Sequence, residues 1–262
     1  MTSHRVVLST SSVYPMRLVD AFSIASQIGC DGLEVMVSSD TDTQSATVIQ
    51  KLSESFGVAV SAIHHPCLLS TANVWGSDPA KKLIKSVELA TDLGASTVVT
   101  HPTFVWQRDF AKNLLGQIES LNSSHEVQIA LENMYPLRAR GRNISTYAPS
   151  WDVRQMKTEH VVLDTSHASV AKLNILEQWA ELAPRVRHLH LSDATGRALD
   201  EHLLPGLGTL PLGELLQQVA KHPTAIDIVV EVNTSGLRTF ETRLAALRGA
   251  VEYVRAGLCA SA

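Results

Sequence analysis

Short apolar runs alternate with longer amphipathic segments along the whole chain, which is the pattern of an α/β protein. The short runs are rich in valine, isoleucine and leucine, as expected for parallel strands covered on both faces. The segment Asp78–Leu93 has helical spacing, with Leu83, Val87 and Ala90 on one face and lysines on others. The eight predicted strands are Arg5–Ser9, Gly32–Val37, Val58–His64, Thr97–Thr100, Val127–Glu132, His160–Asp164, Val186–Leu191 and Ile226–Glu231.

Helix-ending and helix-starting residues punctuate this pattern. Gly29, Gly57 and Gly94 each lie between a predicted helix and the next strand, where a glycine cap is expected. Asp78 and Asp109 are predicted to cap the amino ends of two helices.

Eight strand-helix units in 262 residues predict a single (β/α)₈ TIM barrel that forms one domain over residues 1–262. An open, doubly wound sheet is the alternative that the pattern leaves open. The longest irregular stretch, Pro136–Ser150, is predicted to be an active-site loop rather than a domain boundary.

Composition narrows the class of protein. No segment has the length and hydropathy of a signal peptide or a membrane span, so we expect a cytoplasmic protein without a membrane partner. The three cysteines are widely spaced and are interpreted as free structural thiols. A formal net charge of −4 argues against a strongly basic nucleic-acid binder.

Ionisable side chains collect at the carboxyl ends of the predicted strands, where barrel enzymes place their catalytic groups. The third to eighth strands end at, or directly before, acids and histidines, namely His64 with His65, His101, Glu132, Asp164, His190 and Glu231.

Carboxylates at the ends of buried strands are costly to desolvate unless a positive charge meets them, and lysine and arginine are missing from these ends. A divalent cation is therefore the expected partner, because facing carboxylates would otherwise repel one another. The predicted central ligands are Glu132, Asp164, His190 and Glu231. Their mixed chemistry suits manganese, zinc, magnesium or cobalt, with one ion expected and up to three allowed.

Further candidates lie close to these ends in the sequence. His167 follows Asp164 by three residues, and Asp200 and His202 form a DEH element ahead of a glycine-bearing turn.

Several strings of the chain resemble those of the xylose isomerase-like TIM-barrel superfamily. They are VVTHP at 98–102, ALEN at 130–133, VVLDTSH at 161–167, HLHLSD at 188–193, DEH and PGLG within 200–208, and VVEVN at 229–233. This superfamily contains sugar and sugar-phosphate isomerases and epimerases together with the endonuclease IV nucleases. The resemblance covers nearly the whole chain.

The resemblance implies a divalent-metal-dependent isomerase or epimerase of a sugar, a sugar phosphate or a related polyol, working through an enediolate-like intermediate. In that branch a Glu, Asp, His, Glu quartet holds the metal, and the resemblance assigns these roles to Glu132, Asp164, His190 and Glu231. It also implies that Glu132 and Glu231 are the catalytic acid and base. His167 contacts the substrate in that branch.

The endonuclease IV branch binds three zinc ions, and the chain offers a residue for each additional ligand: His64, His101, His167, Asp200 and His202. His64 is preferred to His65 because His-x-Pro-x-Leu resembles the spacing of that branch. A zinc-dependent abasic-site phosphodiesterase is therefore the alternative function. The net negative charge favours the isomerase, since a protein that bends DNA needs a basic surface around its active site. A barrel that binds metal or ligand without catalysis is the third hypothesis.

Four residues are predicted to contact a carbohydrate substrate. Besides His167, Arg197 lies near the place of an arginine in the ketose epimerase branch, Arg138 lies in the arginine-rich loop after Glu132, and Trp106 could form an aromatic wall. A homo-oligomer is expected from the family rather than from any surface stripe.

Overall fold

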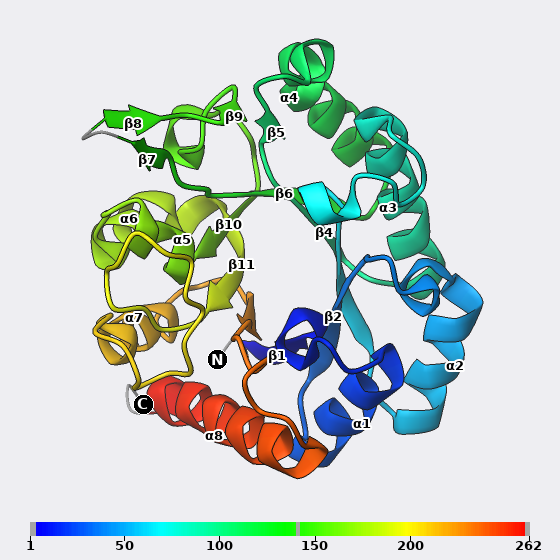
Figure 1. The fold of residues 1–262 in the computed structure, drawn as a ribbon, viewed down its shortest axis with the longest axis vertical. Coiled ribbons are helices and arrows are strands. Elements are labelled where there is room, and N and C mark those ends of the chain that lie inside the picture. Colours follow the sequence, from blue (N-terminus) through cyan, green and yellow to red (C-terminus); the bar gives the residue numbers. More distant parts are fainter. Residues whose placement is uncertain (1–3, 140–141, 260–262) are drawn as a thin grey trace.

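Eight parallel strands close into a barrel in the computed structural model, which describes residues 4–139 and 142–259 (Figure 1). The side chains of residues 138, 139, 142 and 143 lie outside this description. The order around the barrel is β1-β12-β11-β10-β6-β4-β3-β2. The TIM-barrel prediction is confirmed. The barrel strands are β1 (Arg5–Ser9), β2 (Gly32–Met36), β3 (Val60–His64), β4 (Thr97–Thr100), β6 (Gln128–Glu132), β10 (Val161–Asp164), β11 (Val186–Leu191) and β12 (Asp227–Val230).

Helices form a ring outside the strands, and the last of them, α8, packs against the first, α1 (Figure 1). Their bounds are α1 (Leu18–Ile28), α2 (Ala46–Phe56), α3 (Pro79–Leu93), α4 (Arg108–Ser124), α5 (Thr165–Val170), α6 (Ile175–Leu182), α7 (Leu212–Val219) and α8 (Phe240–Cys259). Short 3₁₀ turns precede the first three helices, namely η1 (Thr10–Val13), η2 (Thr41–Gln44) and η3 (Leu69–Thr71), and two more, η4 (Val153–Gln155) and η5 (Ala183–Arg185), precede β10 and β11. In the described part of the chain, every helix is too short or too polar to cross a bilayer.

Alternation along each strand decides what the barrel interior contains. Leu131 and Leu163 join the large apolar cluster between the strands and the helices, whereas Ala130 and Val162 form a separate cluster with Val99. Because successive side chains of a strand point to opposite faces, the residue after Leu131 or Leu163 turns inward again. The same period therefore carries the acids at the ends of β6 and β10 into the barrel mouth.

The predicted glycine caps are confirmed, since Gly29, Gly57 and Gly94 all end helices in the left-handed region. Asp78 caps α3 by accepting from the backbone of Ala80 and Lys81, as predicted.

The prediction that Asp109 caps a helix is wrong. Helix α4 begins at Arg108, so Asp109 lies inside its first turn and Gln107 precedes the helix. The Gln107 side chain turns back to accept from Thr103 Oγ1 and Phe104 N, which ties the entry of the helix to the preceding short strand. Asp109 retains a favourable position, because the amino end of a helix attracts negative charge.

The stretch Pro136–Ser150 contains more regular structure than its composition indicates. Strands β7 (Leu137–Ala139) and β8 (Arg142–Ile144) pair as an antiparallel hairpin, and β9 (Tyr147–Ala148) pairs with β5 (Thr103–Phe104). This loop after β6 is therefore joined to the loop after β4, at the carboxyl end of the barrel.

Candidate metal centre at the mouth of the barrel

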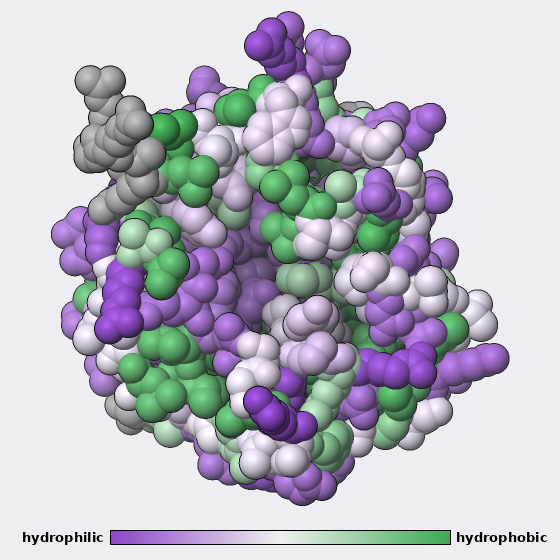
Figure 2. All heavy atoms as spheres, viewed as in Figure 1, coloured by the Kyte–Doolittle hydropathy of each residue, from purple (hydrophilic) through white to green (hydrophobic). Residues whose placement is uncertain are grey.

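Four ionisable side chains from neighbouring strands meet at the carboxyl end of the barrel. Glu132, Asp164, His190 and Glu231 belong to or directly follow β6, β10, β11 and β12, and each is at least nine-tenths buried. His190 Nδ1 lies 2.7 Å from Glu231 Oε2, 3.4 Å from Glu132 Oε1 and 3.7 Å from Asp164 Oδ2. Figure 2 shows a hollow in the middle of one face with hydrophilic residues inside it.

The separations between these atoms fit ligands of one divalent ion. Two nitrogen or oxygen ligands at 2.0–2.2 Å from zinc are about 2.8 to 3.6 Å apart when the angle at the metal lies between 90° and tetrahedral. The observed distances from His190 Nδ1, 2.7 to 3.7 Å, bracket that range. Moreover, His190 Nδ1 and Asp164 Oδ2 are buried without hydrogen-bond partners, which is rare for buried polar atoms. Glu132, Asp164 and His190 are together able to reach a common ion.

A buried carboxylate on the opposite side of the barrel orients His190. Glu34, in the middle of β2, is fully buried, and its Oε2 lies 2.6 Å from His188 Nε2 and 3.2 Å from His190 Nε2. When His190 Nε2 donates to this carboxylate, Nδ1 carries the lone pair and faces the three carboxylates. Sequence reasoning missed Glu34, although a lone acid inside the apolar run GLEVM was a usable signal.

The charge of Glu34 is stabilised by the histidines that it contacts. Burial raises its pKa, but the charge of His190 and the hydrogen bond from His188 outweigh burial and hold that pKa well below its usual value. Glu34 therefore stays ionised and keeps its accepting role over the whole physiological range.

One group of histidines flanks Glu132 from β3 and β4. His64 Nε2 and His101 Nε2 lie 3.4 and 3.0 Å from Glu132 Oε2, so both face the same carboxylate oxygen. His65 faces the other way, toward helix α3, where its Nδ1 lies 3.0 Å from Ser86 Oγ. Burial and the neighbouring charge of His64 lower the pKa of His65 to about 3. The structure thus places His64, rather than His65, in the mouth.

A second group lies on the other side of Glu132 and joins α5 to the loop after β11. His167 Nε2 lies 3.2 Å from Asp200 Oδ2, and His202 Nε2 lies 3.1 Å from Asp200 Oδ1. Asp200 also accepts from Ser166 Oγ at 2.6 Å, and His167 Nδ1 lies 3.0 Å from Glu132 Oε1. The three residues Asp164, His167 and His202 can reach one ion.

The loop that carries Asp200 and His202 is fixed by Asp193. The Asp193 carboxylate accepts from the backbone of Ala194, Gly206 and Leu210. Gly208 passes so close that a β-carbon there would collide with Asp193 Oδ1 and the Ala194 backbone. The glycine-bearing turn is therefore required by close packing.

His202 itself adopts a left-handed backbone conformation, with a φ of 44°. Such a conformation is unfavourable for a residue with a side chain and persists only where neighbours impose it. Here the backbone N–H of His202 donates to Ser166 Oγ, and its carbonyl accepts from Asn233 N.

Histidines supply the positive charge around these acids. Among the ion pairs of residues 4–139 and 142–259, the carboxylates of Glu132, Asp164, Asp200 and Glu231 pair only with imidazoles. Burial would lower the pKa of His101 and of His202, but the nearby negative groups outweigh burial and raise each pKa to about 10. Protons and metal ions therefore compete for the same nitrogens.

The remaining predicted substrate contacts lie farther out. Arg197 is exposed in the loop after β11, and its charge acts on Glu201 rather than on the central acids. Trp106 is 56 % exposed and stacks on Phe104, with ring centroids 4.5 Å apart. The prediction for Arg138 falls on a side chain outside the described part of the chain.

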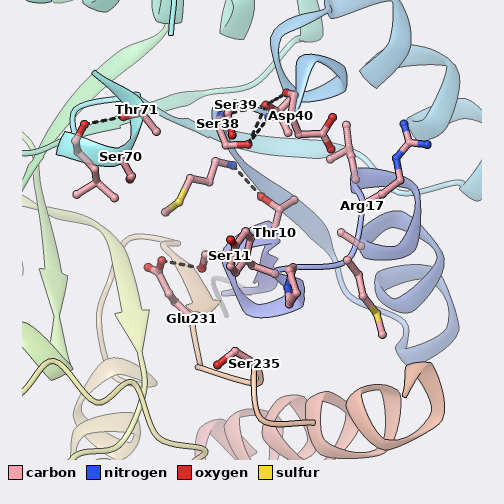
Figure 3. Close-up of a pocket in the computed structure, with 18 of the residues that line it drawn as sticks. Thr10, Ser11, Arg17, Ser38, Ser39, Asp40, Ser70, Thr71, Glu231 and Ser235 are labelled. Atoms are coloured by element: carbon pink, nitrogen blue, oxygen red, sulfur yellow. Dashed lines mark hydrogen bonds between the residues drawn. The ribbon is translucent and has the colours of Figure 1, made fainter. Parts of the chain in front are cut away.

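A cavity of about 930 Å³ opens beside Glu231, between the loops that follow β1, β2 and β3 (Figure 3). Hydroxyl side chains dominate its polar lining, including Thr10, Ser38 and Ser70. Ser11 Oγ donates to Glu231 Oε1 at 2.8 Å, so this carboxylate is positioned at the boundary between the cavity and the metal centre.

Comparison with known proteins identifies relatives over nearly the whole chain. Residues 22–256 match the family model described as xylose isomerase-like TIM barrel. The uncharacterized protein Rv0498 of Mycobacterium tuberculosis is 38 % identical over 273 residues, covering 97 % of this chain and 98 % of that protein.

Two solved structures share the fold at low sequence identity. A D-tagatose 3-epimerase-like protein aligns with a TM-score of 0.69 and 19 % identity, over 96 % of this chain and 98 % of its own. The IOLI protein, solved with a zinc atom bound, aligns with a TM-score of 0.70 and 16 % identity, over 95 % of this chain and 97 % of its own.

Proposed function

The chain belongs to the xylose isomerase-like TIM-barrel family, and from this membership we propose that it is a divalent-metal-dependent isomerase or epimerase. The substrate is a sugar, a sugar phosphate or a related polyol, and the reaction moves a proton at a carbon beside a carbonyl group. Glu132, Asp164, His190 and Glu231 hold the ion. When bound, that ion polarises the carbonyl and hydroxyl oxygens of the substrate.

The arrangement of two glutamates around His190 is the observation that carries this proposal. Glu132 Oε1 and Glu231 Oε2 lie 3.4 and 2.7 Å from His190 Nδ1, one on each side of the quartet. A proton transfer between neighbouring carbons needs an acid and a base within hydrogen-bond reach of the same substrate. We assign these roles to Glu132 and Glu231, with Ser11 holding Glu231 in place.

The cavity beside Glu231 supports a small, hydroxylated substrate. Its volume of about 930 Å³ lies within the usual range for small-molecule sites. Arg17 is the one lysine or arginine among its described lining residues, and the Arg17 guanidinium lies 2.7 Å from Asp42. A phosphate group is bound best by a guanidinium that has no other anionic partner, and Arg17 already has one. The lining therefore favours uncharged sugars and polyols over their phosphates.

Hydrogen exchange with solvent provides the test. The manganese-loaded protein is incubated in D₂O with a panel of ketoses, aldoses and their phosphates, and loss of the proton beside the carbonyl is followed by NMR. We expect exchange in at least one substrate, and none after chelation or in Glu231→Gln. Glu54→Gln, an exposed change on α2, is the matched control and should behave as wild type. Absence of exchange across the panel with metal bound would refute the proposal.

A zinc-dependent abasic-site phosphodiesterase is the second candidate, because a specific observation favours it. All five further ligand candidates gather around the quartet: His64 and His101 on one side, and His167, Asp200 and His202 on the other. Two or three zinc ions could therefore be held, and a site with two metal ions can stabilise both the attacking and the leaving oxygen of a phosphodiester.

An incision assay distinguishes the two functions. A labelled duplex with a single abasic site is incubated with the zinc-loaded protein, and the products are separated by denaturing electrophoresis. Chelator-sensitive incision beside the lesion, lost in Glu132→Gln, would favour the nuclease. An intact duplex under conditions that support exchange on a sugar would exclude it.

A further inference from the structure

Cys67 lies beside the two histidines that flank Glu132, in the turn that follows β3. Its backbone N–H donates to the carbonyl of His65 at 2.8 Å, which folds the HHPC segment back over the end of the strand. Its sulfur, one ring nitrogen of His64 and one of His101 all lie within 4.8 Å of one another. The rings of His64 and His101 meet edge to face, with centroids 5.0 Å apart.

Both imidazoles of this group also face one oxygen of Glu132. His64 Nδ1 lies 3.1 Å from the carbonyl of His65, to which it donates, so Nε2 is the nitrogen that the neutral imidazole offers to a metal ion. That nitrogen lies 3.4 Å from Glu132 Oε2, and His101 Nε2 lies 3.0 Å from the same oxygen. Glu132 is 1 % exposed, and this oxygen has no hydrogen-bond partner. A divalent ion held by these two imidazoles would therefore lie beside the buried Glu132 carboxylate and offset its charge.

We propose that Cys67, His64 and His101, together with the outer oxygen of Glu132, form a thiolate-containing zinc site beside the quartet. Four ligands of the types Cys, His, His and Glu match the tetrahedral preference of zinc. The 3.0 and 3.4 Å separations of the two histidines from Glu132 Oε2 agree with ligands that share an ion, which are about 2.8 to 3.6 Å apart. A thiolate selects zinc or cobalt over magnesium and manganese, which prefer oxygen ligands.

This zinc site rests on the metal centre of the proposed function only in that the two share the carboxylate of Glu132. The inner oxygen, Oε1, faces His190 and the quartet, while Oε2 faces the cysteine-containing group. With an ion bound on this side, Oε2 is a metal ligand and no longer takes a proton. The occupancy of this site therefore determines whether Glu132 acts as a base or as a bridge between two ions.

Cobalt titration of the metal-free protein tests the assignment, because thiolate ligation of Co²⁺ gives an intense near-ultraviolet charge-transfer band. We expect this band to appear within two equivalents of Co²⁺. Cys67→Ser should abolish it and weaken the binding of one equivalent more than about tenfold, since even losing an outer-shell partner costs 10- to 100-fold. Cys30→Ser is the matched control, because Cys30 lies between α1 and β2 and outside this group. Cys259, an exposed thiol, is replaced by serine in every sample.

Asp164→Asn separates this proposal from the proposed function, because Asp164 contacts the quartet and not the cysteine-containing group. This variant should lose binding at the quartet and keep the thiolate band. Absence of the band in wild type, or its persistence in Cys67→Ser, overturns the assignment of Cys67 without affecting the quartet.

A thiol assay on the protein with its native residue at position 67 covers the case in which Cys67→Ser fails to fold. Zinc should protect one thiol against Ellman's reagent, and X-ray absorption of the zinc-loaded protein should show a sulfur ligand at about 2.3 Å. Unchanged reactivity of all thiols, together with a spectrum of nitrogen and oxygen ligands only, would also refute the site.

Discussion

Replacing Glu34 by glutamine tests whether the carboxylate inside the barrel controls the metal centre from a distance. The substitution keeps the volume of a fully buried side chain and removes its charge. Glu34 Oε2 accepts from His188 and His190 at 2.6 and 3.2 Å, whereas a glutamine offers one neutral oxygen and one amide group that donates. The His190 ring should therefore be held less firmly, and His190 should be a weaker base.

The expected loss follows from what outer-shell partners contribute. Removing a carboxylate that holds a metal-binding histidine weakens metal affinity by about 10- to 100-fold. At 1.4 kcal/mol for each factor of ten, this corresponds to about 1.4 to 2.8 kcal/mol of binding free energy. The apo fold should survive, because the change replaces a buried carboxylate by an amide of similar shape.

Competition against a chromophoric chelator measures the zinc affinity of Glu34→Gln and of wild type at the same pH. Asp152→Asn is the control, since Asp152 is also buried but pairs with Arg154, away from the mouth. That variant should lose stability and retain wild-type affinity. If Glu34→Gln binds zinc as tightly as wild type, Glu34 does not orient His190 and the reasoning fails.

Three further predictions concern stability. Gly208→Ala should lower the melting temperature and the affinity for metal, because its β-carbon collides with the Asp193 carboxylate that fixes the loop of Asp200 and His202; an unchanged melting temperature in a scanning calorimeter would contradict this packing. The metal-free protein should lose stability as the pH rises from 6.5 toward 10, since His101 and His202 have pKa values of about 10 when folded and an ordinary value of 6.5 when unfolded. Urea titrations across this pH range check the sign of the change. Zinc should stabilise the protein more at the upper end of the range, where protons no longer compete for the imidazoles. Arg243→Met should lower the free energy of unfolding by about 3 kcal/mol or more, because this buried arginine donates to three backbone carbonyls, those of Val13, Tyr14 and Leu237, which would lose their partner. The urea midpoint measures the loss, and Arg248→Met, on the exposed face of α8, is the control that should change it little.

The barrel and its strand ends were predictable because they depend on local periodicity. Apolar runs indicated all eight strands to within two residues, and glycine caps marked the approach to three of them. The period of two then places Glu132 and Asp164, the last residues of β6 and β10, in the mouth. The convergence of Glu132, Asp164 and His190 follows from strand adjacency alone, since β6, β10 and β11 are successive strands of a parallel barrel.

Contacts between side chains on opposite sides of the barrel could not be predicted from the sequence. Glu34 on β2 meets His188 and His190 on β11, and these strands are three positions apart in the closed sheet. Which residues share a level inside the barrel depends on strand stagger, which no local pattern fixes. Cys67 was interpreted as a structural thiol because the three cysteines are widely spaced and form no CxxC pair. Its neighbour His101 comes from another βα unit, so their proximity appears only in the folded barrel.

Glu132 lies between two groups of histidines, one from the ends of β3 and β4 and one from α5 and the loop after β11. On the β3 and β4 side, His64 ends β3, and Cys67 and His101 lie in the loops that follow β3 and β4. Substitutions in these loops could add or remove an ion while leaving the quartet and the apolar packing of the barrel intact. The number of ions that the mouth can hold is thus set at its rim and not by the barrel beneath it.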